Sequence, residues 1–252
     1  MTNADMLDRL PDDPAWGHRQ VAGSGGVTLH HVRLGRGDPV LLLHGWPGFW
    51  YDWRRVLMPL SDVADVIAPD LRGFGDSDKP DLPPAEGYTP GVLAADLLAL
   101  LDGLEVPRVV VAGHDIGATI AQTLALGHPD RVRALALFNP PYPGIGQRRL
   151  EPSAQREFWY QHFHNLPWSD RLIAHDRETV RLYLAHFYDH WCGRKQAVRG
   201  ARVRGDRRCV RAARRHEGQH RLLPGARRGQ TGPDSRAFAG VTDPAAHGDR
   251  LG

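Results

Sequence analysis

The hydrophobic residues of the first two thirds of the chain alternate between strand-like and helix-like spacing. VTLHHVRL (27–34) alternates apolar and polar residues with a period of two, which predicts a strand. PVLLLHG (39–45) and VRALALFN (132–139) are continuous apolar runs, which are typical of strands buried in a parallel sheet. DVIAPD (65–70) and the β-branched run RVVVAG (108–113) predict two further strands.

Segments with helical spacing separate these strands. They are WRRVLMPL (53–60), GVLAADLLALLDGL (91–104) and ATIAQTLALGHP (118–129). Thr89 followed by Pro90 is a capping residue before a first-turn proline, which predicts the start of the second helix. The polar, Gly- and Pro-rich segment 71–88 is predicted to be a loop. Strands that alternate with helices indicate an α/β fold, a mostly parallel sheet with helices on both faces.

Charge divides the chain into two unequal parts. Residues 1–193 hold 17 Lys and Arg against 24 Asp and Glu, whereas residues 194–252 hold 15 against 5. The formal net charge of +3 therefore conceals a strongly basic C-terminal segment. Segments of such different charge seldom form one compact domain, although 252 residues suffice for one α/β domain with an inserted lid.

The N-terminal pattern and the apolar runs bear on where the protein is expected to reside. The N-terminal MTNADMLDRLPDDP lacks the basic-then-apolar pattern of a signal peptide, and no apolar run approaches the roughly 18 residues of a membrane span. Cys192 and Cys209 fit no metal-ligand spacing and no disulfide framework. We expect a cytoplasmic protein with no membrane partner.

Gly113-His114-Asp115-Ile116-Gly117 lies between a predicted buried strand and a predicted helix. Small residues two before and two after a central side chain permit the tight, strained turn called a nucleophile elbow. The turn would raise Asp115 above the carboxyl edge of the sheet, where a helix N-terminus stabilises an anion.

His44-Gly45-Trp46-Pro47-Gly48 follows an earlier strand, at the same edge of the sheet. Backbone N–H groups of Trp46 and Ile116 could converge there on one oxygen atom and form an oxyanion hole. A plain turn rich in helix and strand breakers is the alternative interpretation of HGWPG alone.

The motifs HGWPG, APDLRGFGDSDKP and GHDIG, in this order, resemble the α/β-hydrolase superfamily over about residues 16–200. The aspartate in the elbow resembles the epoxide hydrolase and dehalogenase branch. The resemblance implies an α/β-hydrolase core (residues 1–143) followed by an incomplete helical lid (residues 144–200). Residues 201–252 are left as a basic tail of low order.

An elbow aspartate implies displacement at an sp³ carbon, which leaves an alkyl ester on Asp115 that an activated water then hydrolyses. Relatives that remove halide carry Trp directly after the nucleophile, or Arg there and three residues later, whereas this chain has Ile116 and Thr119. Epoxide opening is therefore favoured. The alternatives are a hydrolytic dehalogenase of the same fold and a non-catalytic ligand-binding or truncated product.

The lid of epoxide hydrolases carries tyrosines that donate a proton to the ring oxygen. Phe158-Trp159-Tyr160-Gln161 resembles the segment with the first such tyrosine, which makes Tyr160 the expected proton donor. We expect no cofactor and no metal, because the lid histidines His162, His164, His186 and His190 lack a partnering set of carboxylates. Trp46, Phe49, Trp50, Trp159 and Trp168 suggest an apolar pocket for a small apolar epoxide.

The family pattern next requires a second lid tyrosine, more core strands, a triad acid and a histidine. Residues 194–252 offer no strand-like apolar run, so neither a triad acid nor a triad histidine is identifiable. The histidines and aspartates without a predicted strand to position them are His216, His220, His247, Asp206, Asp234, Asp243 and Asp249.

Three interpretations of the basic segment compete. A solvated arm and a nucleic-acid-binding tail both leave the interrupted lid unexplained. The third is a shifted reading frame, because Arg, Ala, Gly and Pro have codons of G and C. Residues 203–224 read one base later permit FEAIVDAYVRHAGMRASIAYYR, which resembles an epoxide hydrolase lid. We therefore predict a frameshift between about 196 and 203, no nucleic-acid partner, and a chain that is inactive or alkylated once without turnover.

Overall fold

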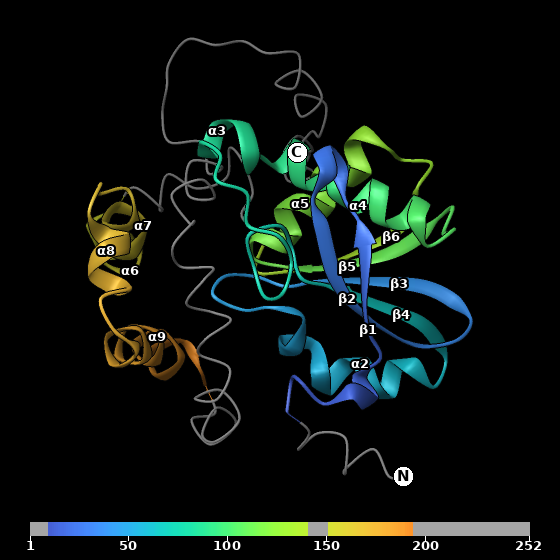
Figure 1. Ribbon diagram of the computed structural model, residues 1–252, viewed down its shortest axis with the longest axis horizontal. Helices are drawn as coiled ribbons and strands as arrows, with labels where there is room; N and C mark the ends of the chain where they lie inside the picture. Colours follow the sequence, from blue (N-terminus) through green and yellow to red (C-terminus); the bar gives the residue numbers. More distant parts are fainter. Residues whose placement is uncertain (1–9, 141–150, 194–252) are drawn as a thin grey trace, which may run out of the picture.

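The computed structural model describes residues 10–140 and 151–193 of the chain. Its centre is a six-stranded sheet with the strand order β1-β2-β4-β3-β5-β6 (Figure 1). The strands are β1 (His18–Ala22), β2 (Thr28–Gly35), β3 (Asp38–Leu43), β4 (Ala64–Pro69), β5 (Val109–His114) and β6 (Val132–Phe138). β3 pairs in parallel with β4 and β5, β5 pairs in parallel with β6, and β2 pairs antiparallel with β1 and β4.

Helices cover both faces of this sheet, as the alternation of strands and helices predicts. α4 (Pro90–Gly103) and α5 (Ile116–Gly127) lie on one face, and α2 (Arg54–Ser61) lies on the other (Figure 1). Each face has its own apolar cluster, one with Leu97 and Val111 and the other with Leu57 and Val66. The short elements are η1 (Pro14–Trp16), η2 (Ser24–Gly26), η3 (Trp50–Trp53) and α3 (Pro84–Gly87).

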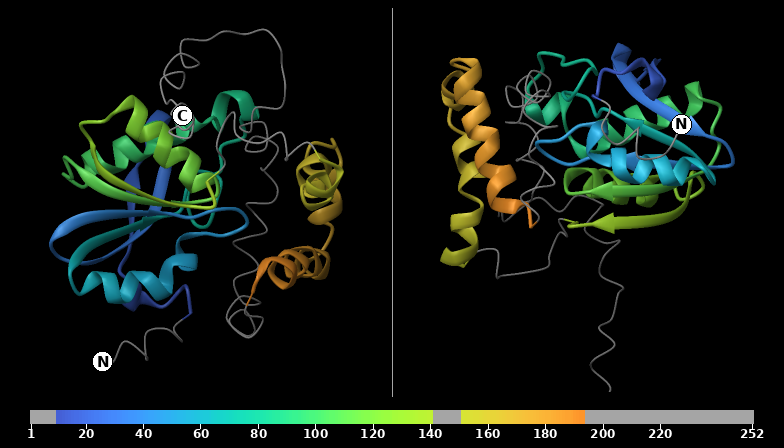
Figure 2. Two further views of the ribbon diagram at one scale, coloured as in Figure 1. Left: turned by 180° about the vertical axis from the view of Figure 1, so that it is seen from behind. Right: turned by 90° about the horizontal axis from the view of Figure 1, so that it is seen from below.

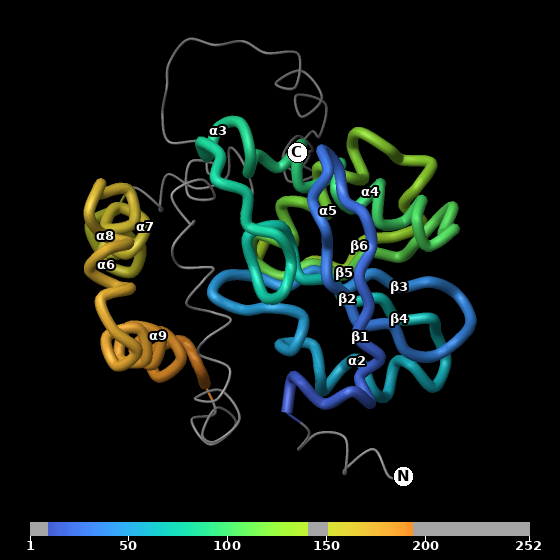
Figure 3. Tube along the Cα trace, in the orientation of Figure 1, coloured from blue at the N-terminus to red at the C-terminus, as the bar shows by residue number. Residues whose placement is uncertain are grey.

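Four helices form a separate layer beside the sheet. They are α6 (Pro152–Glu157), α7 (Trp159–His164), α8 (Ser169–Ile173) and α9 (Arg177–Trp191). Figures 2 and 3 show this layer, drawn in yellow to orange, beside the core. We call these four helices the lid. Val180, Leu184 and Phe187 recur on one side of α9, where they join the two core clusters.

Most predicted elements are confirmed within a residue or two. Thr89 caps α4, and its hydroxyl oxygen accepts a hydrogen bond from the Val92 amide at 3.2 Å. Three details differ from the prediction. Segment 71–88 contains the short helix α3, β1 was not predicted, and β6 is not the buried strand that VRALALFN suggested.

The exposure of β6 has a positional cause. It is the last strand of the described sheet, so it has a described neighbour on one side only. Leu135 and Phe138 are therefore exposed, although Val132 at the start of the strand is buried. An apolar run gives a strand its composition, but neighbouring elements decide whether it is buried.

None of the helices within residues 10–140 and 151–193 is long and apolar enough to cross a membrane.

Candidate active site

Asp115 occupies a sharp turn between β5 and α5. Its backbone adopts φ 53° and ψ −119°, a conformation that L-residues with a side chain rarely take. A Cβ atom on Gly113 would lie 2.5 Å from the Gly117 carbonyl oxygen. One on Gly117 would lie 2.5 Å from the Leu43 carbonyl oxygen. Both predicted glycines are therefore required by the closeness of the backbone at this turn.

The loop after β3 meets this turn. The Trp46 amide donates a hydrogen bond to Asp115 Oδ2 at 3.1 Å, and a Cβ atom on Gly45 would lie 2.7 Å from Asp115 Cβ. Ile116 follows Asp115 directly as the first residue of α5. Segments 44–48 and 113–117, which lie far apart in the sequence, are thus brought into contact.

His44 holds the Trp46 loop in place. Its Nε2 accepts a hydrogen bond from the Leu71 amide at 3.0 Å, so Nδ1 carries the proton and donates it to the Gly45 carbonyl oxygen at 3.0 Å. Complete burial lowers the pKa of His44, which keeps the ring neutral. Both ring nitrogens are engaged with the backbone, which makes His44 a support for the loop. Pro47 follows Trp46 in this loop through a cis peptide bond.

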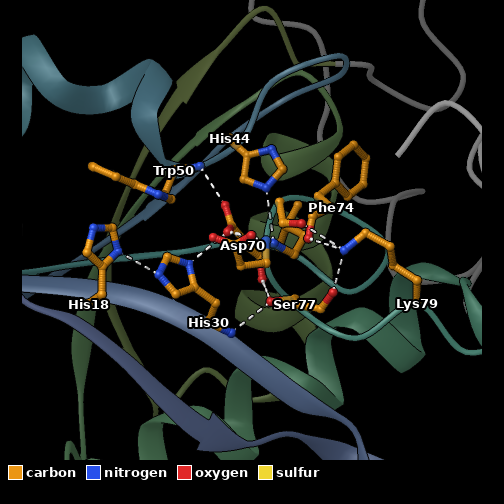
Figure 4. A network of polar contacts seen from close by, with 11 residues as sticks. His18, His30, His44, Trp50, Asp70, Phe74, Ser77 and Lys79 are labelled. Atoms are coloured by element: carbon orange, nitrogen blue, oxygen red, sulfur yellow. Dashed lines mark hydrogen bonds and ion pairs between the residues drawn. The ribbon is translucent and has the colours of Figure 1, made fainter. Parts of the chain in front are cut away.

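A buried carboxylate next to this loop organises the segment after β4 (Figure 4). Asp70 accepts hydrogen bonds from the Trp50 amide at 2.9 Å and the Asp76 amide at 2.9 Å, and it pairs with His30 Nδ1 at 2.8 Å. His30 Nε2 in turn lies 2.9 Å from His18 Nδ1. Burial raises the pKa of Asp70, but the contacts with His30, together with the nearby His44 and the Trp50 amide, hold that pKa below its ordinary value.

His30, Asp70 and Asp76 also bring potential metal-ligand atoms within 4.8 Å of one another. The hydrogen bonds of His30 and Asp70 give these residues a structural role instead, because His30 bridges His18 and Asp70, and Asp70 accepts hydrogen bonds from two backbone amides.

Tyr160 of the lid lies directly against the core loop. Its ring stacks on the Trp46 ring, with 5.0 Å between centroids and 5° between planes. The Gln161 side-chain amide donates to the Tyr160 hydroxyl oxygen at 3.2 Å. Phe187 and Trp191 of α9 complete the aromatic group, with ring centroids 4.8 Å and 5.9 Å from that of Trp46.

The buried His164 and the half-buried Tyr183 form a polar pair that the sequence did not predict. His164 Nε2 lies 2.5 Å from the Tyr183 hydroxyl oxygen, and the His164 ring packs edge-on against Trp46. Burial lowers the pKa of His164 to about 4 and raises the pKa of Tyr183, so both groups are neutral near pH 7. The pair joins α7 to α9, and only the spacing of α9 hinted that Tyr183 faces inward.

Other lid histidines have separate partners, His162 on Gln155 and His190 on Glu157. The predicted aromatic lining is only partly assembled. Trp46 and Phe49 are buried near the loop, whereas Trp50 packs against Trp16 in the core. Trp159 is 40% exposed but its ring stacks on Phe187 with 5.8 Å between centroids, and Trp168 is 50% exposed. The residues considered for the triad in segment 194–252, from Asp206 to Asp249, lie outside the described residues, as does the predicted basic tail.

Comparison with known proteins identifies the fold. A family model described as the alpha/beta hydrolase fold matches residues 38–198. The soluble epoxide hydrolase of Corynebacterium sp. (strain C12) is 38% identical over 166 residues, which are 64% of this chain and 55% of that protein. Epoxide hydrolase 2 of Siraitia grosvenorii is 47% identical over 111 residues, which are 44% of this chain and 34% of that protein. The chain thus matches between a third and just over half of the length of these curated relatives.

Solved structures give the same result. The epoxide hydrolase CorEH superposes with a TM-score of 0.64 and 30% identity, over 81% of this chain and 73% of that one. Cfl2 from Burkholderia cenocepacia superposes with a TM-score of 0.67 and 33% identity, over 82% of this chain and 74% of that one.

Proposed function

Because the chain belongs to the α/β-hydrolase family and fits its epoxide hydrolase branch, we propose that Asp115 opens an epoxide by forming an alkyl ester with it. The observation that carries this proposal is the position of Trp46. Its amide donates to the Asp115 carboxylate and its ring stacks on Tyr160, so one residue connects the attacking oxygen with the phenol that would donate a proton.

In the proposed step, an Asp115 carboxylate oxygen attacks an epoxide carbon, and the bond from that carbon to the ring oxygen breaks. The Tyr160 O–H gives its proton to the departing oxygen, which becomes an alcohol, and water later reprotonates the phenolate. The Gln161 side-chain amide donates to the Tyr160 oxygen, so this hydrogen bond uses an acceptor position of the phenol and not its proton. A small epoxide with an apolar substituent fits the aromatic surroundings formed by Trp46, Phe187 and Trp191.

Hydrolysis of the ester is the second half of the proposal, and we propose that this chain does not complete it. An attack by water needs a histidine whose free ring nitrogen can take a proton. Among the described residues next to the site, His44 uses both ring nitrogens on the backbone, and His164 bonds Tyr183 through Nε2. His114 belongs to the elbow turn itself, where its ring lies against Gly45. The Trp46 and Ile116 amides would still hold the oxyanion formed in that step. The expected product is a chain alkylated once at Asp115.

Intact-protein mass spectrometry after incubation with styrene oxide tests this proposal. We expect a mass increase of one epoxide, mapped to the peptide that holds Asp115, and no steady formation of the diol. The Asp115→Asn variant should not be labelled, and Tyr160→Phe should be labelled at least about tenfold more slowly. Asp102→Asn, at an exposed position of α4, is the matched control and should be labelled like the wild type.

The outcomes separate the two halves of the proposal. Labelling that persists in Asp115→Asn would overturn the assignment of Asp115 as the nucleophile. Steady diol formation that is lost in Asp115→Asn would support Asp115 as the nucleophile, and it would overturn the proposal that this chain does not hydrolyse the ester.

We also propose that the basic segment is translated out of frame. The composition of β6 supports this, because it is that of an interior strand although β6 ends the described sheet. Sequencing the coding DNA across codons 190–230 tests it. A one-base shift that restores a lid helix ending in AYYR would support the proposal, and an unchanged reading frame would contradict it.

A further inference from the structure

β6 has the composition of an interior strand but the position of an edge strand. Its sequence, VRALALF, holds one charged residue, and it lies at the margin of the described sheet (Figure 2). β5 beside it is equally apolar, and Val109 and Val111 there are fully buried. In β6, by contrast, Leu135 is 39% exposed and Phe138 is 50% exposed. A long apolar edge strand readily pairs with another strand.

Both faces of β6 are apolar. From Ala134 to Phe138 the strand pairs with β5 in regular register, with Leu135 beside Val111 and Ala136 beside Ala112. Ala134, Ala136 and Phe138 therefore share one face of the sheet, and Leu135 and Leu137 share the other. A partner strand would have to be apolar on both faces as well.

The hydrogen bonds of this stretch to β5 determine which of its peptide groups point away from β5. The Asp115 amide donates to the Phe138 carbonyl oxygen at 3.0 Å, so Phe138 directs its peptide groups towards β5. By alternation, Ala136 and Ala134 do the same, while Leu135 and Leu137 direct their N–H and C=O groups away from the sheet.

We propose that β6 pairs antiparallel with β6 of a second copy of this chain, about a two-fold axis that passes between the two Ala136 residues. This register places Leu135 opposite the partner's Leu137 and Leu137 opposite the partner's Leu135, and each of these two pairs exchanges two hydrogen bonds. Ala136 faces the partner's Ala136 as a non-hydrogen-bonded pair, and Ala134 faces the partner's Phe138, so a small side chain meets a large one. Arg133 lies outside the paired stretch and meets no like charge.

The second copy is favoured over residues 194–252 of the same chain by charge. That segment holds 15 Lys and Arg against 5 Asp and Glu, and it would place guanidinium groups on apolar faces. A two-fold pairing also closes on itself, because each β6 is used once. A single strand pair is smaller than a standard interface of about 1,600 Å², so we expect a reversible, concentration-dependent dimer.

Sedimentation velocity of the full chain over about a hundredfold range of concentration tests the proposal. The wild type should shift from one to two chains per particle, and Leu135→Lys should remain monomeric because it places a charge on the paired edge. Leu182→Lys makes the same change at a position on α9 that is 57% exposed, and it should dimerise like the wild type. Far-UV circular dichroism checks that both variants fold.

Cross-linking gives a second test that does not depend on a charged variant. In an oxidant, Ala136→Cys should form an intermolecular disulfide that joins the two β6 peptides, whereas Leu182→Cys should form none through its new thiol. A wild type that is monomeric throughout, association that Leu135→Lys does not weaken, growth beyond the dimer, or equal cross-linking of the two Cys variants would overturn the proposal.

Discussion

At the scale of single residues, the turn at Asp115 leaves little choice of side chain. Gly117 lies where a Cβ atom would approach the Leu43 and His44 carbonyl oxygens to 2.5 and 2.6 Å. These are backbone atoms of a central strand and its loop, so they cannot rotate away. A methyl group there would therefore force β3, β5 and α5 apart where they meet.

We predict that Gly117→Ala lowers the free energy of unfolding by about 1–3 kcal/mol, the usual cost of overpacking. It should also abolish labelling of Asp115, because the turn must open to relieve the clash. Gly127→Ala is the matched control at the other end of α5, where no atom beyond the neighbouring backbone of the helix lies within 4 Å of the added carbon. Urea denaturation should show it unchanged or slightly more stable. Equal effects of the two variants would contradict the steric argument.

At the scale of elements, helix α4 depends on its first residue. The Thr89 hydroxyl satisfies the Val92 amide, and Pro90 starts the helix without needing a hydrogen-bond partner for its nitrogen. We predict that Thr89→Ala lowers the free energy of unfolding by about 1 kcal/mol. Thr89→Ser, which keeps the hydroxyl, should recover most of this loss in the same urea titration. A serine variant as unstable as the alanine variant would assign the effect to the lost methyl group.

Elements were predictable from the sequence where their determinants are local. Thr89 and Pro90 mark the start of α4, and the glycines around Asp115 mark the turn after β5. The burial of β6 was mispredicted because it depends on which strand lies beside it. The contact of His164 with Tyr183 joins two helices across 19 residues, and no short-range pattern encodes it.

The candidate site was predictable in part for the same reason. Asp115 and Trp46 each belong to a motif that ends a strand, and parallel strands bring their carboxyl ends to one edge. That Tyr160 stacks on Trp46 rather than on another aromatic residue is settled by the packing of the lid. Phe187 and Trp191 lie four residues apart on α9 and so reach Trp46 from the same side of that helix.

At the scale of the whole molecule, buried histidines make stability depend on pH. His31 of β2 is 1% exposed, and neither of its ring nitrogens has a hydrogen-bond partner within the described part of the chain. Burial, followed by repulsion from His30, Arg19 and Arg33, lowers the pKa of His31 to about 4. The unfolded chain takes up this proton near pH 6.5, whereas the folded chain resists it until about pH 4.

The sign follows from that difference. Between these two pH values the unfolded state binds more protons, so folding stability falls as the pH falls through the window. For His31 alone the loss is on the order of 3 kcal/mol by pH 4. His164, whose pKa is also lowered to about 4, adds a loss of the same sign.

We therefore predict that His31→Leu and His31→Gln both reduce the loss of stability between pH 7 and pH 4, because neither side chain titrates. They should differ at pH 8, where the histidine is neutral in both states. There His31→Leu should be more stable than the wild type, since it buries no polar group, and His31→Gln should not be. Urea denaturation across this pH range measures both effects. A leucine variant with the pH dependence of the wild type would place the acid sensitivity in other groups, with His164 and His44 the next to replace.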